Sequence, residues 1–345
     1  MSLAQSLKLI EKKFGPNKVL PVSQAVGAFI QHIPTGSLSL DLETGGGWVQ
    51  GKVNEVFGPW SGGKTFIALK TVATNQQLYP DANFAWMDAE GAFDSEWAQT
   101  CGVDLDRLLI FTPEYMEEAL EIADTLIKSN DLFLLVIDSW AALSPKSEFD
   151  GTMEDNTMGL RARVGNKFIR KARPTSDLVK EDIDMGKTTL LIINQTYSGI
   201  GPYATEETPG GKQLGYLAML RVKIRKSDLV QEPNGTVICQ QSTFIVEKNK
   251  TFRPKTKGEF WFNLTDNPMG KAGTISRLDE LVRYAIAFGV IKQSGAWYSL
   301  PEHVYSERFQ GKANMLEWLS EQPEETVNAL EVLVHGAVGL VDANI

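Results

Sequence analysis

The sequence predicts an α/β protein built on a mostly parallel twisted sheet flanked by helices, and two observations lead to this prediction. Between about residues 35 and 265, short apolar runs of strand length alternate with helical stretches, which is typical of a parallel sheet buried on both faces. A glycine-rich turn joins the first of those runs directly to the first of those helices. Such alternation requires crossover connections, which are almost always right-handed.

The elements of this region follow from the apolar spacing. Leu3, Leu7, Ile10 and Phe14 share one face of a helix over residues 2–14, which must dock on another surface because so short a helix is not stable alone. Strands are expected over residues 53–57, 84–87, 132–137 and 190–193. Helices are expected over residues 65–78, 116–129 and 160–171.

After residue 214 the pattern becomes richer in strands. They are expected over residues 219–224, 236–246 and 259–264, with a hairpin turn at 233–235. A linker is expected over residues 267–273, and a small α+β module follows it. That module should contain two short strands near Trp297 and Val304, and helices over 277–288, 313–320 and 324–335. The expected units are therefore residues 1–34, 35–267 and 268–345.

The composition excludes several classes of protein. A chain of 345 residues that is 43% hydrophobic, 22% charged and 9% aromatic is neither largely disordered nor fibrous. No apolar run approaches the ~18 residues that cross a bilayer, and residues 1–14 lack the features of a secretory signal. Two cysteines and three histidines form neither a disulfide framework nor a zinc site. We therefore expect a cytoplasmic protein with no membrane partner.

The net charge of −9 hides an uneven distribution of basic residues. Residues 159–173 contain six lysines and arginines and no acid, and residues 248–257 contain five and no acid. Binding to a polyanion depends on local positive potential rather than on the total charge. The acidic balance of the whole chain therefore does not exclude a nucleic-acid partner.

The strongest chemical signal is a match to the pattern G-x-x-x-x-G-K-[ST]. The matching residues are Gly58, Pro59, Trp60, Ser61, Gly62, Gly63, Lys64 and Thr65. In such a loop, glycines let backbone N–H groups converge on phosphates, and the N-terminus of the helix adds partial positive charge. Lys64 would neutralise the outer phosphates of a nucleoside triphosphate, and the Thr65 hydroxyl would bind Mg²⁺. The alternative is a purely structural glycine-rich turn.

Carboxylates follow two of the predicted strands. Asp138 ends the run 132–137 and is the candidate second oxygen ligand for Mg²⁺, unless it merely ends a strand. Glu90 follows the run 84–87 and would lie at the same carboxyl edge of the sheet, where ligands bind in α/β folds. It is the candidate for orienting an attacking water, with Asp88 as the competitor and a solvated loop carboxylate as the structural alternative.

Gln195 ends the fourth predicted strand and opens a long loop over residues 196–211 that is rich in Gly, Thr and Pro. Loops of this length without secondary structure are usually functional or disordered. A side-chain amide at this strand end could hydrogen-bond a γ-phosphate and transmit its presence to the loop. An amide without function in a turn explains the same residue equally well.

The predicted helix over residues 160–171 combines two faces. At helical spacing, Leu160, Val164 and Phe168 form an apolar stripe, and Arg163, Lys167 and Arg170 form an adjacent basic one. One helix could therefore pack on the core and offer cations to a phosphate backbone. A solvated charged face is the usual alternative, but here no acidic residues alternate with the cations.

These motifs together resemble those of the RecA family of bacterial and phage-encoded DNA recombinases. The segments that match, in family order and spacing, are Thr35-Gly36-Ser37-Leu38-Ser39-Leu40-Asp41, the glycine-rich loop, Met87-Asp88-Ala89-Glu90, Val136-Ile137-Asp138-Ser139, Met158-Gly159-Leu160, Ile193-Asn194-Gln195, Glu247-Lys248-Asn249-Lys250 and Gly295-Ala296-Trp297-Tyr298-Ser299. The resemblance covers about residues 6–325. It implies a RecA-type ATPase core, with an N-terminal docking helix and strand in residues 1–34 and a small α+β C-terminal domain.

The resemblance also implies roles for the candidate residues. ATP and Mg²⁺ would occupy the glycine-rich loop, with Thr65 and Asp138 on the metal. Glu90 would polarise the attacking water, and Gln195 would couple the γ-phosphate to the loop that follows it. Asp94 and Trp97 match positions that bracket the adenine.

Further residues match positions at the contact between protomers. Lys248 and Lys250 correspond to a pair that reaches the γ-phosphate of the neighbouring protomer, in the manner of an arginine finger in trans. Tyr216 corresponds to an interface position. The N-terminal helix would dock on an adjacent protomer, which would cover its apolar stripe.

Two segments match the DNA-binding loops of the family, residues 150–159 and 196–211. The DNA-binding residues implied are Met158, Gly159, Arg163, Arg170, Lys171, Tyr197, Ser198, Gly210, Gly211 and Lys212. The second loop departs from the family pattern, since Thr196, Tyr197 and Ser198 stand where a basic residue is usual. We therefore expect part of its DNA contact to differ.

The implied function is ATP-dependent homologous recombination. The protein would form a helical filament of its own copies on single-stranded DNA, pair that strand with homologous double-stranded DNA and promote strand exchange, with DNA-stimulated ATP hydrolysis. A repressor and mediator proteins are further candidate partners. A hexameric helicase of the same core fold is the alternative, disfavoured by the docking helix and the Lys-x-Lys pair. A filament protein with structural nucleotide would lack Glu90, and a small-molecule kinase would need an acceptor pocket and lid.

Overall fold

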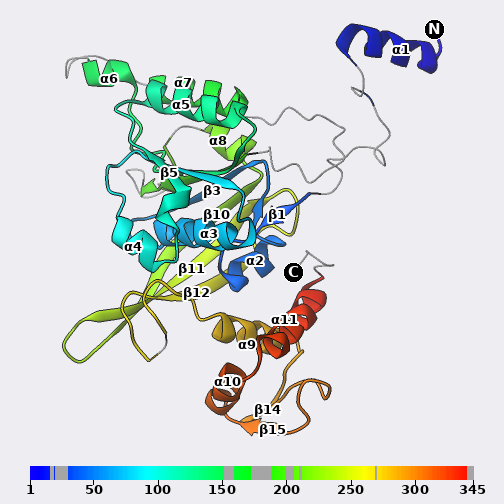
Figure 1. Ribbon diagram of the computed structural model, residues 1–345, viewed down its shortest axis with the longest axis vertical. Helices are drawn as coiled ribbons and strands as arrows, with labels where there is room; N and C mark the ends of the chain where they lie inside the picture. The colour runs from blue at the N-terminus through cyan, green and yellow to red at the C-terminus, as the bar shows by residue number, and fades with distance from the viewer. Residues whose placement is uncertain are drawn as a thin grey trace.

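A computed structural model of the chain describes residues 1–15, 19, 30–150, 159–171, 188–198, 206–209, 212–268 and 270–339. Its centre is an eight-stranded sheet (Figure 1). In spatial order the strands are β12 (Lys257–Asn263), β11 (Val237–Asn249), β10 (Leu220–Gln231), β3 (Val53–Gly58), β7 (Thr189–Gln195), β6 (Leu132–Asp138), β4 (Asn83–Asp88) and β5 (Leu108–Phe111).

Six of these strands, from β10 to β5, run parallel to their neighbours, and β11 and β12 are antiparallel additions at one edge. The central strands β6 and β7 carry uninterrupted apolar runs because both faces of the sheet are covered there. On β6, Leu134 and Val136 face one hydrophobic cluster, and Leu135 and Ile137 face the other. The predicted α/β fold class is confirmed.

Helices cover the two faces of the sheet (Figure 1). Helix α3 (Lys64–Leu78) buries Phe66, Ile67 and Val72 in the first cluster. Helices α5 (Met116–Lys128), α7 (Leu160–Lys171) and α8 (Lys212–Leu217) contribute Met116, Phe168 and Leu214 to the second. The helices predicted over 65–78, 116–129 and 160–171 agree with α3, α5 and α7 to within a residue at each end.

Several short elements carried no periodic signal and were not predicted. They are α2 (Leu38–Thr44), β2 (Trp48–Val49), α4 (Ser95–Thr100), a 3₁₀ turn (Leu105–Arg107), β5, α6 (Lys146–Asp150), β8 (Tyr197–Ser198), β9 (Glu206–Glu207) and α8. Strand β1 (His32–Ile33) lies within residues 1–34, where the resemblance implied a strand. Strands β10 and β11 are longer than expected, because their exposed ends continue as a two-stranded hairpin with a turn near Gly235. Apolar alternation marks only the buried part of such a hairpin.

The C-terminal module contains α9 (Arg277–Ala287), α10 (Lys312–Ser320) and α11 (Glu324–Val338), with a three-stranded sheet of β13 (Lys292–Ser294), β14 (Trp297–Ser299) and β15 (Arg308–Gln310). The prediction of a strand near Val304 is wrong. The backbone N–H groups of Val304 and Tyr305 both donate to the carbonyl of Pro301 and form a turn, and the strand lies at β15. Leu38 and Leu42 of α2 belong to the hydrophobic cluster of this module.

Helix α1 (Leu3–Phe14) forms as predicted and begins with a capping box, in which Ser2 and Gln5 exchange hydrogen bonds. None of its residues is buried, and Leu3 and Phe14 are exposed. The residues around the expected linker are held against the core, since the Gly273 N–H donates to the carbonyl of Asn263 at 2.8 Å. Within the described ranges, no helix is both long and apolar enough to cross a membrane.

Candidate active site

The glycine-rich loop runs from the end of β3 to the start of α3, and its backbone requires glycine at two positions. Gly58 has a φ of 150°, and a Cβ atom there would lie 2.0 Å from the carbonyl oxygen of Ile224. Gly63 has a φ of 92° and forms the N-cap of α3. The loop therefore leaves the N-terminus of α3 open to an anion, as its motif predicts.

Lys64 lies inside this loop with 8% of its surface exposed. Its Nζ donates to the carbonyl oxygens of Gly58 at 3.0 Å and Pro59 at 2.7 Å. Burial lowers the pKa of Lys64, while the carboxylates of Asp138 and Glu90 act in the opposite direction. The ammonium group is thus already positioned among the backbone groups that would surround a phosphate.

Thr65 and Asp138 meet as expected, because the Thr65 Oγ1 donates to Asp138 Oδ2 at 3.0 Å. Burial raises the pKa of Asp138 to about 6, and the nearby carboxylates of Glu90 and Asp88 add to this effect. No cluster of three or more His, Cys, Asp or Glu in the described ranges could hold a metal. One hydroxyl and one carboxylate suit Mg²⁺, which usually completes its shell with waters and substrate phosphates.

The structure separates the two candidates for the catalytic base. Asp88 is buried, and its two oxygens accept the backbone N–H groups of Ala92 and Phe93 at 3.1 and 2.9 Å, so it shapes the turn after β4. Glu90 is exposed, and its Oε1 accepts hydrogen bonds from Ser139 Oγ at 2.5 Å and from Gln195 Nε2 at 2.8 Å. The geometry favours Glu90, since only its carboxylate faces open space beside the loop.

Gln195 lies at the end of β7, beside the glycine-rich loop. Besides its bond to Glu90, its Oε1 accepts a hydrogen bond of 2.6 Å from the indole N–H of Trp60. The neighbouring Asn194 is buried, and its Nδ2 donates to Glu55 Oε1 at 3.0 Å and to the carbonyl of Pro209 at 3.2 Å. Asn194 thus ties the far end of the expected second loop to the sheet, which sequence reasoning missed.

A cavity of about 460 Å³ joins these side chains. Its lining residues are Trp60, Ser61, Lys64, Thr65, Glu90, Asp138, Ser139, Ile193 and Gln195. The structure therefore brings together in one protomer the loop, both expected metal ligands, the candidate base and the candidate sensor amide. Of this set, only Ser139 and Ile193 were not expected to line the site.

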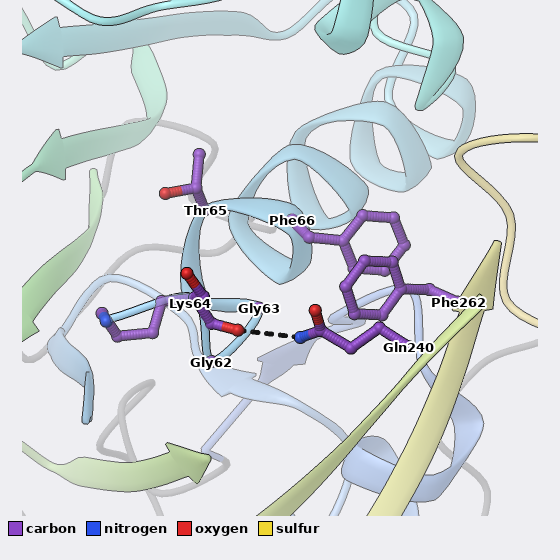
Figure 2. A pocket seen from close by; sticks show the side chains of 8 residues that line it. Gly62, Gly63, Lys64, Thr65, Phe66, Gln240 and Phe262 are labelled. Atoms are coloured by element: carbon purple, nitrogen blue, oxygen red, sulfur yellow. Dashed lines mark hydrogen bonds between the residues drawn. The ribbon is translucent and has the colours of Figure 1, made fainter. Parts of the chain in front are cut away.

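A second cavity of about 230 Å³ shares Ser61, Lys64 and Thr65 with the first and opens towards β11 and β12 (Figure 2). Gln240 lies in it with 7% exposure, and its Nε2 donates to the carbonyl of Ser61 at 2.9 Å. Ser242 donates in the same way to the carbonyl of Gly62 at 2.9 Å. Sequence reasoning missed both residues. Gln240 and Ser242 are two positions apart, so they lie on the same face of β11 as the buried Phe244. Polar residues on a buried face of a strand were the signal that could have pointed to them.

The residues expected to bracket a base lie near the same helix end. Asp94 caps α4 by accepting the N–H of Trp97 at 2.9 Å. The Trp97 ring is half-buried, with its centroid 6.3 Å from that of Phe66 in the first turn of α3. Phe66 in turn stacks on Phe262 at 4.0 Å. An aromatic cluster therefore borders the loop on the side of the second cavity.

Lys248 and Lys250 line neither of these two cavities. Lys248 lines a third, of about 730 Å³, where its Nζ donates to the carbonyls of Gly215 at 2.7 Å and Tyr216 at 2.8 Å. Burial and the neighbouring cations Lys250 and Arg221 lower the pKa of Lys248 to about 8. The arrangement within one protomer is compatible with a role for the lysines at another protomer's site.

The basic helix α7 has the two faces expected. Val164 and Phe168 pack on the core, and Arg163 and Lys167 are exposed. Arg161, on the same helix, is engaged internally with the Ala141 carbonyl, Ser144 and Glu148. The exposed part of the basic cluster is therefore smaller than the sequence suggests.

Other expected DNA-binding residues can be placed only in part. Gly159 precedes α7, Arg170 and Lys171 end it, and Lys212 begins α8. Tyr197 is exposed in β8, which pairs with β9 through Tyr197–Glu207 and Ser198–Glu206. Met158, Gly210 and Gly211 lie outside the described residues, as does most of the segment 150–159.

Comparison with known proteins finds related sequences over nearly the whole chain. Residues 1–265 match the family model of the RecA N-terminal domain. "Protein RecA, chromosomal" of Lactococcus lactis subsp. lactis is 37% identical over 347 aligned residues, covering 99% of this chain and 84% of that protein. "Protein RecA" of Mesoplasma florum is 37% identical, covering 94% and 92% of the two chains, and that of Saccharopolyspora erythraea 37%, covering 98% and 93%.

Proposed function

The chain belongs to the RecA family, and from this premise we propose which of its residues perform the family's reaction. The protein is an ATP-dependent recombinase with DNA-dependent ATPase activity, which forms a filament on single-stranded DNA and exchanges strands with a homologous duplex. The relatives give no support to the helicase alternative. The roles of individual residues are the proposal.

Lys64 and the backbone of the glycine-rich loop hold the β- and γ-phosphates of ATP. The observation that carries this proposal is the single cavity that joins Lys64, Thr65, Glu90, Asp138 and Gln195. Glu90 accepts a proton from, or orients, the attacking water, because its carboxylate lines the cavity, whereas the carboxylate of Asp88 is bound to backbone N–H groups. Gln195 reaches the γ-phosphate and changes its hydrogen bonds when the phosphate leaves.

Thr65 and Asp138 would hold Mg²⁺, which when bound neutralises phosphate charge. Their oxygens fit the ion, and burial raises the pKa of Asp138, while Thr65 and the Lys64 ammonium act in the opposite direction. A cation beside Asp138 would offset that burial. Asp94 and Trp97 border the base, with the aromatic cluster of Phe66 and Phe262 behind them.

Lys248 and Lys250 act on the nucleotide of a neighbouring copy. Their separation from the cavities at the glycine-rich loop of their own protomer supports this assignment. The exposed apolar residues of α1 supply a docking surface between copies, and residues 1–34, 35–267 and 268–345 form the three units. Nucleotide binding and polymerisation then depend on each other, because each γ-phosphate contributes to an interface.

DNA is gripped mainly through its phosphates, so that sequence is tested by base pairing rather than by the protein. Arg163 of α7 supplies an exposed cation for this contact. The remaining contacts come from Arg170, Lys171, Lys212 and the two loops. A repressor and mediator proteins are proposed as further partners of the filament.

Electron microscopy with single-stranded DNA tests the proposal. Purified protein with a non-hydrolysable ATP analogue should form helical filaments on the DNA, and with ADP the filaments should be fewer and shorter. ATP hydrolysis should rise when single-stranded DNA is added. Full hydrolysis by an isolated monomer, indifferent to any polynucleotide, would contradict the proposal.

A further inference from the structure

Trp60 combines high exposure with a specific hydrogen bond. Its side chain is 79% exposed in the glycine-rich loop, yet its indole N–H lies 2.6 Å from Gln195 Oε1. Because the exposed indole ring buries little apolar surface against the protein, hydrophobic packing does not explain why it adopts this conformation. The contact instead joins the phosphate loop to the end of β7, 135 positions later in the sequence.

The contact determines how the Gln195 amide is turned. An indole N–H only donates, so Gln195 must present its oxygen to Trp60. Its Nε2 then points the other way and donates to Glu90 Oε1 at 2.8 Å. Rotating the amide by half a turn would lose both hydrogen bonds.

The same chain of contacts occupies the candidate base. Glu90 Oε1 also accepts the Ser139 hydroxyl at 2.5 Å. One carboxylate oxygen has room for about two donors, so Ser139 and Gln195 together fill Oε1 and fix how the Glu90 carboxylate is turned. Gln195 is bonded at both ends of its amide, so turning the side chain towards a phosphate would break at least one of these bonds.

We propose that Trp60 is a positioning residue that holds Gln195 against Glu90 in the resting protein and so suppresses hydrolysis in the absence of DNA. The inference rests on the proposed roles of Glu90 and Gln195. Binding of ATP and DNA would then break the Trp60 contact and release both groups together. The indole N–H thereby increases the dependence of hydrolysis on DNA.

The test is Trp60→Phe, which keeps an aromatic ring and removes the N–H. Losing one neutral hydrogen bond should raise the DNA-free rate of ATP hydrolysis about 2- to 10-fold. The ratio of the rates with and without single-stranded DNA should fall by a similar factor. Trp297→Phe is the matched control, since Trp297 is also exposed but lies in the C-terminal module.

Fluorescence provides a readout that a merely structural role would not change. The difference between the emission of the wild type and that of Trp60→Phe gives the fluorescence of Trp60. This fluorescence should change when a non-hydrolysable ATP analogue and DNA are added together, because the indole leaves its acceptor. The fluorescence of Trp297, obtained in the same way from Trp297→Phe, should not change. Thermal melting of both variants checks that the fold is intact.

The outcomes separate this inference from the proposed function. A wild type without DNA-stimulated hydrolysis would reject the proposed function itself. A wild type with normal stimulation, and a Trp60→Phe variant whose DNA-free rate is unchanged or lower, would overturn the inference about Trp60 alone. Equal effects of Trp60→Phe and Trp297→Phe would overturn it as well.

Discussion

Lys248 donates a hydrogen bond of 2.8 Å from its Nζ to the carbonyl oxygen of Tyr216, whose own side chain is 64% exposed. A second bond, to the Gly215 carbonyl, places the ammonium group at the C-terminal end of α8, where unpaired carbonyls favour a cation. If a phosphate on a neighbouring copy attracted Lys248, the carbonyls of Gly215 and Tyr216 would lose these hydrogen bonds. The backbone that carries Tyr216 would then be released from Lys248. The proposed trans lysine and the proposed interface residue are thus directly coupled.

Lys248→Ala should lower DNA-stimulated ATP hydrolysis by about 10³-fold, the lower end of what a trans cation supplies. Mixing this variant with Lys64→Ala should restore part of the rate, because the intact Lys248 of one copy then faces the intact glycine-rich loop of the other. Lys255→Ala, which removes a nearby exposed lysine paired with Glu247, is the control. A mixture as inactive as its two components would place Lys248 in a cis role.

Glu90→Gln should retain ATP and DNA binding but lower the rate of hydrolysis by about 10²-fold or more, since an amide cannot take a proton from water. Filament formation by electron microscopy and single-turnover hydrolysis separate the two effects. Asp88→Asn should instead lower thermal stability, because Asp88 accepts two backbone N–H groups in the turn after β4. Normal turnover by Glu90→Gln would transfer the role of base away from Glu90.

Arg163→Ala should weaken binding to single-stranded DNA of any sequence and reduce the slope of log affinity against log salt by about one. Fluorescence anisotropy over a salt series measures the slope. Arg161→Ala on the same helix is the control, since the Arg161 guanidinium is bonded to Ser144 and the Ala141 carbonyl. An unchanged slope for Arg163→Ala would mean that this face of α7 does not contact the DNA backbone.

We expect Glu280 to make the junction between α9 and α2 sensitive to pH. It is 2% exposed and accepts a hydrogen bond of 2.8 Å from Ser37 Oγ. Burial raises its pKa from 4.5 to about 8, and burial raises the pKa of the neighbouring Asp41 to about 7. The folded state therefore keeps protons that the unfolded chain releases. The stability linked to Glu280 is fully present below about pH 4.5 and is lost as the pH rises through 8, and that linked to Asp41 is lost between about pH 3.8 and 7.

Glu280→Gln should accordingly raise the free energy of unfolding at pH 8 by about 1–3 kcal/mol relative to the wild type, and by much less at pH 5. Urea denaturation at the two pH values measures both differences. Glu302→Gln, at an exposed position of the same module, controls for the loss of one charge. An equal effect of Glu280→Gln at both pH values would show that its proton is not linked to folding.

The main strands and helices could be predicted because their period is local. A strand such as β6 is apolar at every buried position, and a helix such as α5 repeats its apolar residues at helical spacing. Three-residue strands such as β15 are too short to show any period, and its exposed residues are not distinguished from a turn. The error at Val304 follows directly from this limit.

The composition of the site was likewise determined by the sequence. Only glycine tolerates the backbone at Gly58 and Gly63, so the loop that surrounds an anion is visible in the residues themselves. Carboxyl ends of parallel strands share one edge of a sheet, which is why Glu90, Asp138 and Gln195 could be expected near that loop before the strand order was known.

The pairing of individual groups was decided only by the tertiary structure. Gln240 reaches the Ser61 carbonyl across 179 positions of sequence, and Trp60 reaches Gln195 across 135. Such contacts depend on which strands lie beside β3 and on how far each side chain extends. A hydrogen bond forms only over about 3 Å with good alignment, so no local pattern can specify its partner, and the folded sheet must bring the two groups together.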